Sequence, residues 1–157
     1  MTSPAVATTP TTALADIYPR IQQFYAGQVR HLDTFRAEEF AATFTEDGVF
    51  DHRPGSEPLA GREAITAAVL EYQRTRHAAD PVQRRHWFNM LQVFPQDDGT
   101  FRTEYYALVL QTRPGTPEPQ IGPSCFVTDV LTVESGANGE PGQLRTKFRR
   151  VRQDHLV

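Results

Sequence analysis

The sequence has only one cysteine, Cys125, among 157 residues, so the chain cannot form an internal disulfide. No apolar run approaches the ~18 residues that a membrane-spanning helix needs. The N-terminal stretch MTSPAVATTPTTALAD lacks the basic start and apolar centre of a secretory signal. A net charge of -3 supplies no excess of positive charge to attract nucleic acid or an anionic membrane. These absences predict a cytoplasmic protein with neither a nucleic-acid nor a membrane partner.

Recognisable motifs for metal or phosphate chemistry are also missing. None of the five histidines lies in an HxH or HExxH pattern, and the chain has no glycine-rich phosphate loop and no GxSxG segment. We therefore expect no metal and no cofactor. The basic stretch RTKFRRVR at 145–152 holds five cations in eight residues. Such a stretch is typical of a solvated edge strand, where charge opposes edge-to-edge aggregation.

Hydrophobic spacing predicts a helical first half. Residues 1–13 are mostly Thr, Ala and Pro and are expected to form a disordered tail, with a single domain over 14–157. A first amphipathic helix is predicted from its apolar residues at three- and four-residue spacings, namely Ile17, Ile21, Phe24, Tyr25, Val29 and Leu32. Because proline is tolerated only in a first turn, Pro19 predicts a start within 15–18. Two further helices are expected over 36–47 and 61–77, separated by a short strand at 48–53.

The second half changes to the two-residue period of β-strands. Four long strands are predicted, at 84–94, 100–112, 120–135 and 143–153, with an Asp-Gly hairpin turn between the first two. Helices followed by antiparallel strands favour an α+β fold with three helices packed on one side of a curved sheet. The first two strands are partly apolar on both faces, so the outer face needs a cover as well. A second copy of the chain would supply it, which predicts a homodimer.

Several polar side chains occur where a packed core is expected, and such residues are natural linings for a cavity between helices and sheet. They are Gln28, Asp33, His52, His86, Asn89, Ser124 and Asp129. Asp129 is flanked by Val127, Val130 and Leu131, and a carboxylate buried there needs a partner or a proton. Asp33 also suits a helix cap, His52 suits a rim position, and His86 can be an ordinary buried histidine.

The chain resembles the SnoaL-like branch of the NTF2-like superfamily over roughly residues 17–152. The resemblance rests on FYAGQVRHLDTFRAEEFAATFTEDGVFDH, LAGREAI and DPVQRRHWFNMLQV. That branch includes polyketide cyclases, scytalone-dehydratase-like enzymes and dioxygenase β subunits. The segments QRRHWFN, IGPSC and LRTKFRRV further resemble small proteins of actinobacterial aromatic polyketide clusters, such as the pyran-ring-forming set of the actinorhodin pathway.

The resemblance implies a cone-like barrel with an internal pocket and an Asp–His catalytic pair, which fall here on Asp33 and His86. Some polyketide cyclases of the superfamily use a strand aspartate as the base, so Asp129 is the alternative functional carboxylate. Two positions depart from the family pattern. Gln28 stands where several relatives have a tyrosine, with Tyr25 one turn earlier. Asn89 follows the histidine by three residues instead of four.

The expected function is that of a cofactor-independent acid–base enzyme acting on an aromatic polyketide intermediate, by dehydration or ring closure. Histidine is the side chain best suited to proton transfer near neutral pH. The residues expected to contact substrate are Tyr25, Gln28, Phe50, His52, Trp87, Asn89, Tyr106, Ser124 and Asp129. A non-catalytic subunit resembling dioxygenase β subunits and a polyketide carrier remain alternatives.

Overall fold

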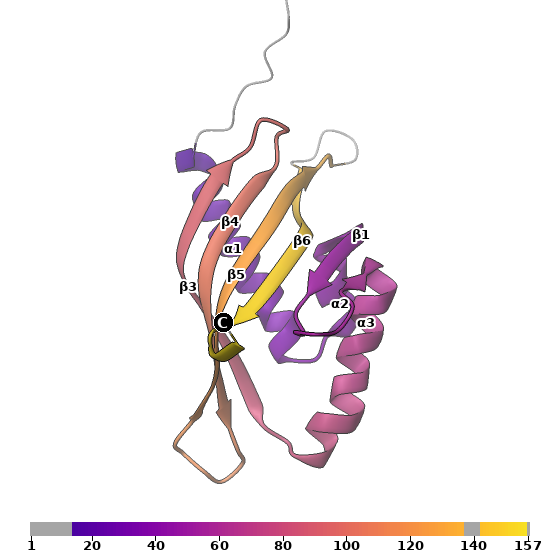
Figure 1. The fold of residues 1–157 in the computed structure, drawn as a ribbon, viewed down its shortest axis with the longest axis vertical. Coiled ribbons are helices and arrows are strands. Elements are labelled where there is room, and N and C mark those ends of the chain that lie inside the picture. The colour runs from indigo at the N-terminus through magenta and orange to yellow at the C-terminus, as the bar shows by residue number, and fades with distance from the viewer. Residues whose placement is uncertain (1–13, 137–141, 157) are drawn as a thin grey trace, which may run out of the picture.

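The computed structural model describes residues 14–136 and 142–156, which form one α+β unit (Figure 1). The predicted disordered tail at 1–13 lies outside these residues. The helices are α1 (Leu14–Asp33), α2 (Ala37–Ala42) and α3 (Gly61–Tyr72), and a π-helical turn, Gln73–His77, continues α3. The strands are β1 (Phe44–Asp51), β2 (Leu59–Ala60), β3 (Gln83–Pro95), β4 (Phe101–Thr112), β5 (Gln120–Glu134) and β6 (Gln143–Gln153), and a short 3-10 turn, Asp154–Leu156, follows.

The six strands form one mixed sheet in the order β2-β1-β6-β5-β4-β3. Neighbouring strands are antiparallel except β1 and β6, which are parallel. Strand β6 therefore lies between β1 and β5, so the prediction that the basic stretch 145–152 is an edge strand is wrong. The edge among the long strands is β3, and α1 approaches it.

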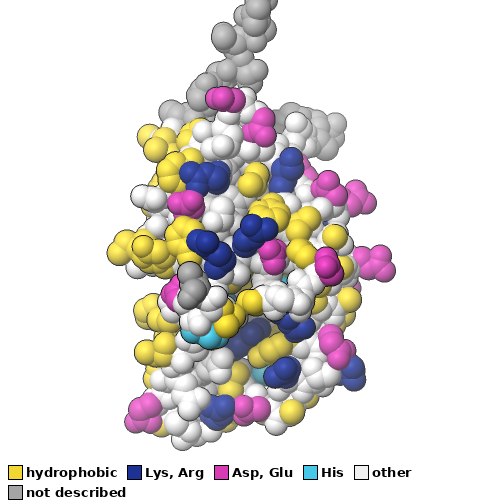
Figure 2. Space-filling view, viewed as in Figure 1, with side chains coloured by type: hydrophobic (Ala, Val, Ile, Leu, Met, Phe, Trp, Pro, Cys, Tyr) yellow, Lys and Arg dark blue, Asp and Glu magenta, His cyan; other side chains and the backbone are white. Residues whose placement is uncertain are grey.

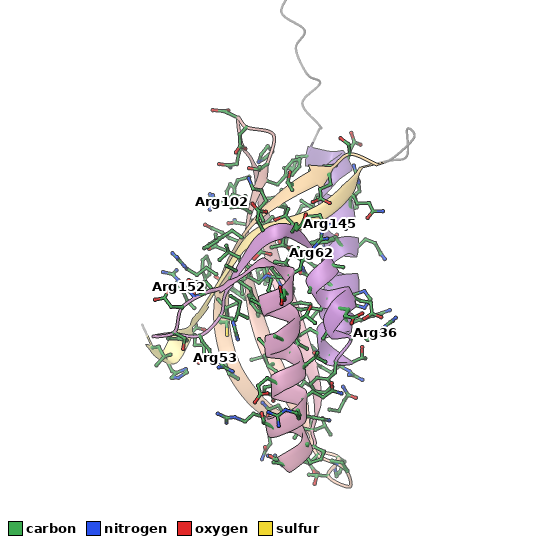
Figure 3. All side chains as sticks on the ribbon, turned by 90° about the vertical axis from the view of Figure 1, so that its right-hand side faces the viewer. Arg36, Arg53, Arg62, Arg102, Arg145 and Arg152 are labelled. Carbon is green, nitrogen blue, oxygen red and sulfur yellow. The ribbon has the colours of Figure 1, made fainter. Side chains whose placement is uncertain are left out.

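Helices α1 and α3 are the two long helices, and they lie on the same side of the sheet (Figure 3). Helix α1 begins at Leu14, so Pro19 lies in its second turn, one turn later than predicted. Helix α2 ends at Ala42, and β1 begins at Phe44, within the segment predicted to be helical. Arg62 in the first turn of α3 donates two hydrogen bonds to the carbonyl oxygen of Phe44, at 2.9 and 2.6 Å, and thereby ties α3 to β1.

The four long strands lie within one residue of their predicted limits, but two local details differ. In the hairpin after β3 only Gly99 has a positive φ (81°), while the Asp98 carboxylate accepts hydrogen bonds from Thr100. Strand β3 has a bulge between Asn89 and Gln92, with Met90 at a φ of 55°. The bulge reverses the alternation, so Met90 is 66% exposed instead of sharing the inward face with His86.

The core lies between the sheet and the helices in two adjoining clusters. One is centred on α1 and the inward residues of β4 and β5, and the other on α2, β1 and α3. None of the helices in the described residues is both long and apolar enough to cross a membrane. The strong, cone-like curvature expected of the sheet stays a prediction.

The outer face of the sheet is turned away from α1 and carries exposed apolar side chains. Trp87, Tyr106 and Ile121 are all more than half exposed there. Figure 2 shows hydrophobic and cationic side chains interspersed over this face.

Candidate active site

A cavity of about 300 Å³ lies between the inner face of the sheet and α3. Its walls are mostly apolar, and they include Phe50, Phe88, Tyr105 and Val127. This volume is at the lower end of the range for small-molecule sites, about 300–1,000 Å³. The cavity is therefore large enough for a compact ligand of a few fused rings. The polar groups that reach it are few, and each has a distinct setting.

His86 and Asp33 form a hydrogen-bonded pair at the cavity wall. Nδ1 of His86 lies 2.5 Å from Oδ1 of Asp33, and the backbone N–H of His86 donates to Oδ2 at 3.1 Å. Both side chains are largely buried, at 14% and 7% exposure. Since a carboxylate can only accept, the short contact assigns the hydrogen of the neutral ring to Nδ1 and leaves the lone pair on Nε2. No partner of Nε2 is recorded among residues 14–136 and 142–156, and His86 lines the cavity.

The position of Asp33 follows from the way α1 ends. Asp33 is the last residue of α1, and Phe35 turns the chain with a φ of 57°, a left-handed conformation that is costly for an aromatic residue. Packing holds Phe35 in place, because its ring lies 6.2 Å from that of Tyr72 and 4.4 Å from that of His77. The turn brings the carboxylate of Asp33 to the free edge of β3, where it satisfies the backbone N–H of His86.

Arg84 occupies the inward position two residues before His86 and also lines the cavity. Its guanidinium lies 4.2 Å from the centre of the Tyr72 ring and 5.6 Å from that of Phe35. Its Nε is buried without a hydrogen-bond partner in the described part of the chain. A guanidinium stacked on aromatic rings without a carboxylate partner is a suitable anchor for an anion of a ligand.

A buried ion pair lies beneath the floor of the cavity. Arg149 is 3% exposed and Asp129 is fully buried, and Nη2 of Arg149 lies 2.6 Å from Oδ2 of Asp129. The same carboxylate oxygen accepts hydrogen bonds from Tyr25 at 2.8 Å and Tyr105 at 3.2 Å. Arg149 is thus the partner that the sequence analysis required for a carboxylate buried between apolar residues.

Burial and charge fix the protonation of this cluster. Burial, followed by the charge of Asp129, raises the pKa of the Tyr25 hydroxyl well above its usual value. Burial also raises the pKa of Tyr105, an effect that Arg149 opposes and Asp129 reinforces. Burial alone would lower the pKa of Arg149, but the Asp129 carboxylate more than compensates, and the net shift is upward. Both phenols are therefore neutral donors, and Arg149 is a permanent cation.

Gln28 supports this cluster from α1. Its Oε1 accepts a hydrogen bond from Nη2 of Arg149 at 2.6 Å, and its amide nitrogen donates to Thr43 and Thr146. Gln28 is 1% exposed and does not line the cavity, so the prediction that it is a lining residue is wrong. It occupies the apolar stripe of α1 because Arg149 needs a buried acceptor there. Tyr25 and Asp129 likewise lie behind the cavity wall.

Two other predicted residues do reach the cavity. Phe50 and His52 both line it, with ring centres 4.4 Å apart and nearly parallel planes. Burial, and after it the charge of Arg53, lowers the pKa of His52. His52 is therefore neutral at neutral pH.

Four predicted contacts lie on the wrong side of the sheet. Trp87, Asn89 and Tyr106 are exposed on the outer face, and exposed Ser124 donates a hydrogen bond to Asp154 at 2.5 Å. Strand alternation explains each case, since these positions neighbour the inward residues His86, Phe88, Tyr105 and Cys125. The bulge follows Asn89 instead of preceding it, so it does not turn Asn89 inward.

The sequence predictions did not include Arg84 and Arg149 among the site residues. Because residues two apart on a strand lie on the same face, the sequence could have placed Arg84 beside His86. Arg149 was not considered because residues 145–152 were predicted to form a solvated edge strand. The predicted burial of the Asp129 carboxylate did indicate that a cation was missing from the core. In the part of the chain that the structure describes, no three His, Cys, Asp or Glu side chains are grouped so as to hold a metal ion.

An α+β domain with an internal cavity and a carboxylate–imidazole pair defines a class of small ligand-binding domains and enzymes. Within it, the SnoaL-like domain model matches residues 14–150, and the chain belongs to this family of the NTF2-like superfamily. A more distant NTF2-like protein with a cystatin-like fold, from Novosphingobium aromaticivorans, supports the fold alone, with 17% identity over 93% of each chain and a TM-score of 0.68.

Similar solved structures come from actinobacteria. ActVI-ORFA from Streptomyces coelicolor is 37% identical over 88% of this chain and 98% of its own, with a TM-score of 0.78. Aln2 from a Streptomyces species is 35% identical over 96% of both chains, with a TM-score of 0.79. A Catenulispora acidiphila protein in complex with S-DNPA is 42% identical over 90% of this chain and 96% of its own, with a TM-score of 0.77. No curated protein matches the chain.

Proposed function

We propose that the protein is a cofactor-independent acid–base enzyme that acts on an aromatic polyketide intermediate, by dehydration or ring closure, in the cytoplasm. The observation that carries the proposal is the Asp33–His86 pair, which presents an unbonded imidazole nitrogen to an apolar cavity of about 300 Å³. The similarity to ActVI-ORFA and to the protein in complex with S-DNPA supports the substrate class.

In this mechanism Asp33 is a positioning residue and His86 is the base. The Asp33 carboxylate holds the ring hydrogen on Nδ1, so Nε2 can accept a proton from the carbon next to a substrate carbonyl. The C–H electron pair then forms an enolate. For dehydration, the enolate electrons form a C=C bond as the C–O bond to the β-hydroxyl breaks, and the proton on Nε2 moves to the departing oxygen to form water.

Arg84 would hold an acidic substituent of the substrate at one end of the cavity. Its guanidinium stacks on the Tyr72 ring, and its Nε has no hydrogen-bond partner among the described residues. Inward side chains on a strand recur every ~7 Å, so a ligand acid at Arg84 leaves the adjacent part of the ligand beside His86. The proposed substrate is therefore an acid with fused rings and a carbonyl group.

The proposal includes a homodimer that covers the outer face of the sheet. Trp87 (61% exposed), Tyr106 (59%) and Ile121 (74%) are exposed apolar side chains on three neighbouring strands of that face, β3, β4 and β5, and a second copy would cover them. The adjacent arginines of β6 would pair with acidic residues of the second copy at the rim.

The test compares wild type with His86→Ala and with His155→Ala, a matched control in the exposed C-terminal turn. Candidate hydroxylated dihydronaphthalenone acids are incubated with each protein and followed by mass spectrometry and absorbance. We expect wild type and His155→Ala to form product that has lost one water or has isomerised, and His86→Ala to bind the acids without turnover. A fully active, folded His86→Ala variant would refute the mechanism, and equal binding without turnover by all three proteins would indicate a carrier.

A further inference from the structure

Arg149 is the most deeply buried cation that touches the cavity, and its nitrogens are used unequally. Nε donates to both oxygens of Asp129 at 2.9 and 3.1 Å. Nη2 donates to Asp129 and to Gln28, each at 2.6 Å. No partner for Nη1 is recorded in the described residues. Two of the three guanidinium nitrogens therefore fix the group, and the third has two free N–H donors.

The free nitrogen of Arg149 keeps some accessible surface. In residues 14–136 and 142–156, the side-chain atoms that are both fully buried and without a hydrogen-bond partner belong to Thr45, His77, Arg84 and Arg145. Nη1 of Arg149 has no partner there and is not in this group, so it is not fully buried. It thus retains open space, although Arg149 as a whole is only 3% exposed. Arg149 lines the cavity, and we infer that Nη1 opens onto it.

The surrounding rings place this donor near the proposed base. The guanidinium carbon lies 5.7 Å from the centre of the Phe88 ring and 6.0 Å from that of Tyr105. Phe88 is the next inward residue after His86, ~7 Å along the strand. Along β3 the cavity thus presents Arg84, His86 and then the Arg149 guanidinium over Phe88.

We propose that Nη1 of Arg149 donates hydrogen bonds to the substrate carbonyl oxygen and stabilises the enolate oxygen that forms when His86 removes the adjacent proton. The inference rests on the proposed function and gives it its second catalytic residue. Arg149 suits this role because Asp129 and Gln28 fix its geometry before the substrate binds, and such preorganised donors lower barriers most where water is excluded. The side chains that line the cavity around it are mostly apolar.

The inference can be tested without turnover, using 6-hydroxy-2-naphthoic acid as an enolate mimic and 2-naphthoic acid as its control. The naphtholate oxygen mimics the enolate, and its absorbance differs from that of the neutral naphthol. We expect wild type to bind the naphtholate about 10- to 100-fold more tightly than the neutral naphthol, the range for hydrogen bonds to a charged group, so that deprotonation occurs at lower pH than in solution. His86→Ala should retain this shift, since Arg149 holds the oxygen.

Arg149→Lys is the decisive variant because lysine keeps the charge beside Asp129 but has no second nitrogen to present to the cavity. It should lose the naphtholate preference while binding 2-naphthoic acid as wild type does. The double variant Asp129→Asn with Arg149→Gln removes the ion pair without leaving a buried lone charge, and it should lose the preference too. Should Arg149→Lys not fold, this double variant decides.

An unshifted naphthol titration in wild type, or an undiminished shift in either folded Arg149 variant, would overturn the inference. With a turned-over substrate, Arg149→Lys should lower kcat by about 10²–10³-fold with little change in KM. Turnover that depends on His86 but no naphtholate shift would reject the role of Arg149 alone. A shift without any turnover would reject the proposed reaction alone.

Discussion

Replacing Asp33 with asparagine changes one atom at the pair and reverses the proton placement on His86. Both carboxylate oxygens of Asp33 accept, one from the backbone N–H of His86 and one from Nδ1. The backbone N–H is always a donor, so asparagine must direct its oxygen there and its NH₂ toward Nδ1. Nδ1 then has to accept, and the ring hydrogen moves to Nε2. The nitrogen facing the cavity thereby loses the lone pair that the mechanism requires.

The expected loss of activity is large and the expected loss of stability is small. A wrong histidine tautomer lowers kcat by about 10⁴-fold in the serine protease triad, and we expect a loss of about 10³–10⁴-fold here. The side chains are nearly isosteric, so unfolding free energy should fall by only about 1–3 kcal/mol, the value of one hydrogen bond to a charged group. Turnover measures the first quantity, and urea denaturation measures the second.

The tautomer itself can be read from the ¹⁵N chemical shifts of the His86 ring. We expect the protonated nitrogen to be Nδ1 in wild type and Nε2 in Asp33→Asn. An Asp33→Asn variant with wild-type turnover, or with its ring hydrogen still on Nδ1, would refute the reasoning. A carrier protein would show the change of tautomer without any functional loss.

Three other predictions concern the buried ion pair, acid stability and the outer face. Asp129→Leu should lower the unfolding free energy by about 3–5 kcal/mol in urea denaturation, because it leaves the Arg149 charge buried alone. Adding Arg149→Met should restore much of that free energy. A loss below about 1 kcal/mol in Asp129→Leu would contradict the prediction. The pKa of His52 is lowered in the folded state, so the unfolded chain binds more protons below the ordinary histidine pKa and stability falls on acidification there. His52→Gln should weaken that acid dependence in thermal melts, and an unchanged dependence would oppose it. Tyr106→Arg should yield monomers in sedimentation experiments while leaving ligand binding intact, and an unaffected dimer or a monomeric wild type would place the interface elsewhere or remove it.

Much of the fold follows from hydrophobic periodicity, because the long strands β3 to β6 and helix α1 each bury one continuous face. Periodicity cannot give strand order, which depends on contacts between distant segments. The stretch 145–152 illustrates this, since its cations are typical of an edge while its parallel pairing with β1 makes it central. Met90 illustrates a second limit, because a one-residue bulge reverses the side-chain faces without an obvious signal such as glycine or proline.

The candidate site was predicted where the family resemblance named the residues and was missed where only the three-dimensional contacts show them. The resemblance assigned His86 and Asp33, and the structure brings them together, while their catalytic role stays a prediction. Arg149 could not be placed without knowing that Asp129 and Gln28 meet it from β5 and α1. Residues such as Tyr106 and Ser124 were assigned to the cavity by their chemistry, although simple alternation places them on the opposite face.

The central claim is that His86 removes a proton next to a carbonyl group inside the cavity. Hydrogen–deuterium exchange of a fused-ring ketone acid in D₂O, followed by mass spectrometry, tests this most directly because it detects proton abstraction whichever product forms. We predict that wild type incorporates deuterium next to the carbonyl far faster than buffer does, and that folded His86→Ala matches the buffer rate. Exchange at the buffer rate in wild type for an acid shown to bind, or equally fast exchange in His86→Ala, would contradict the account.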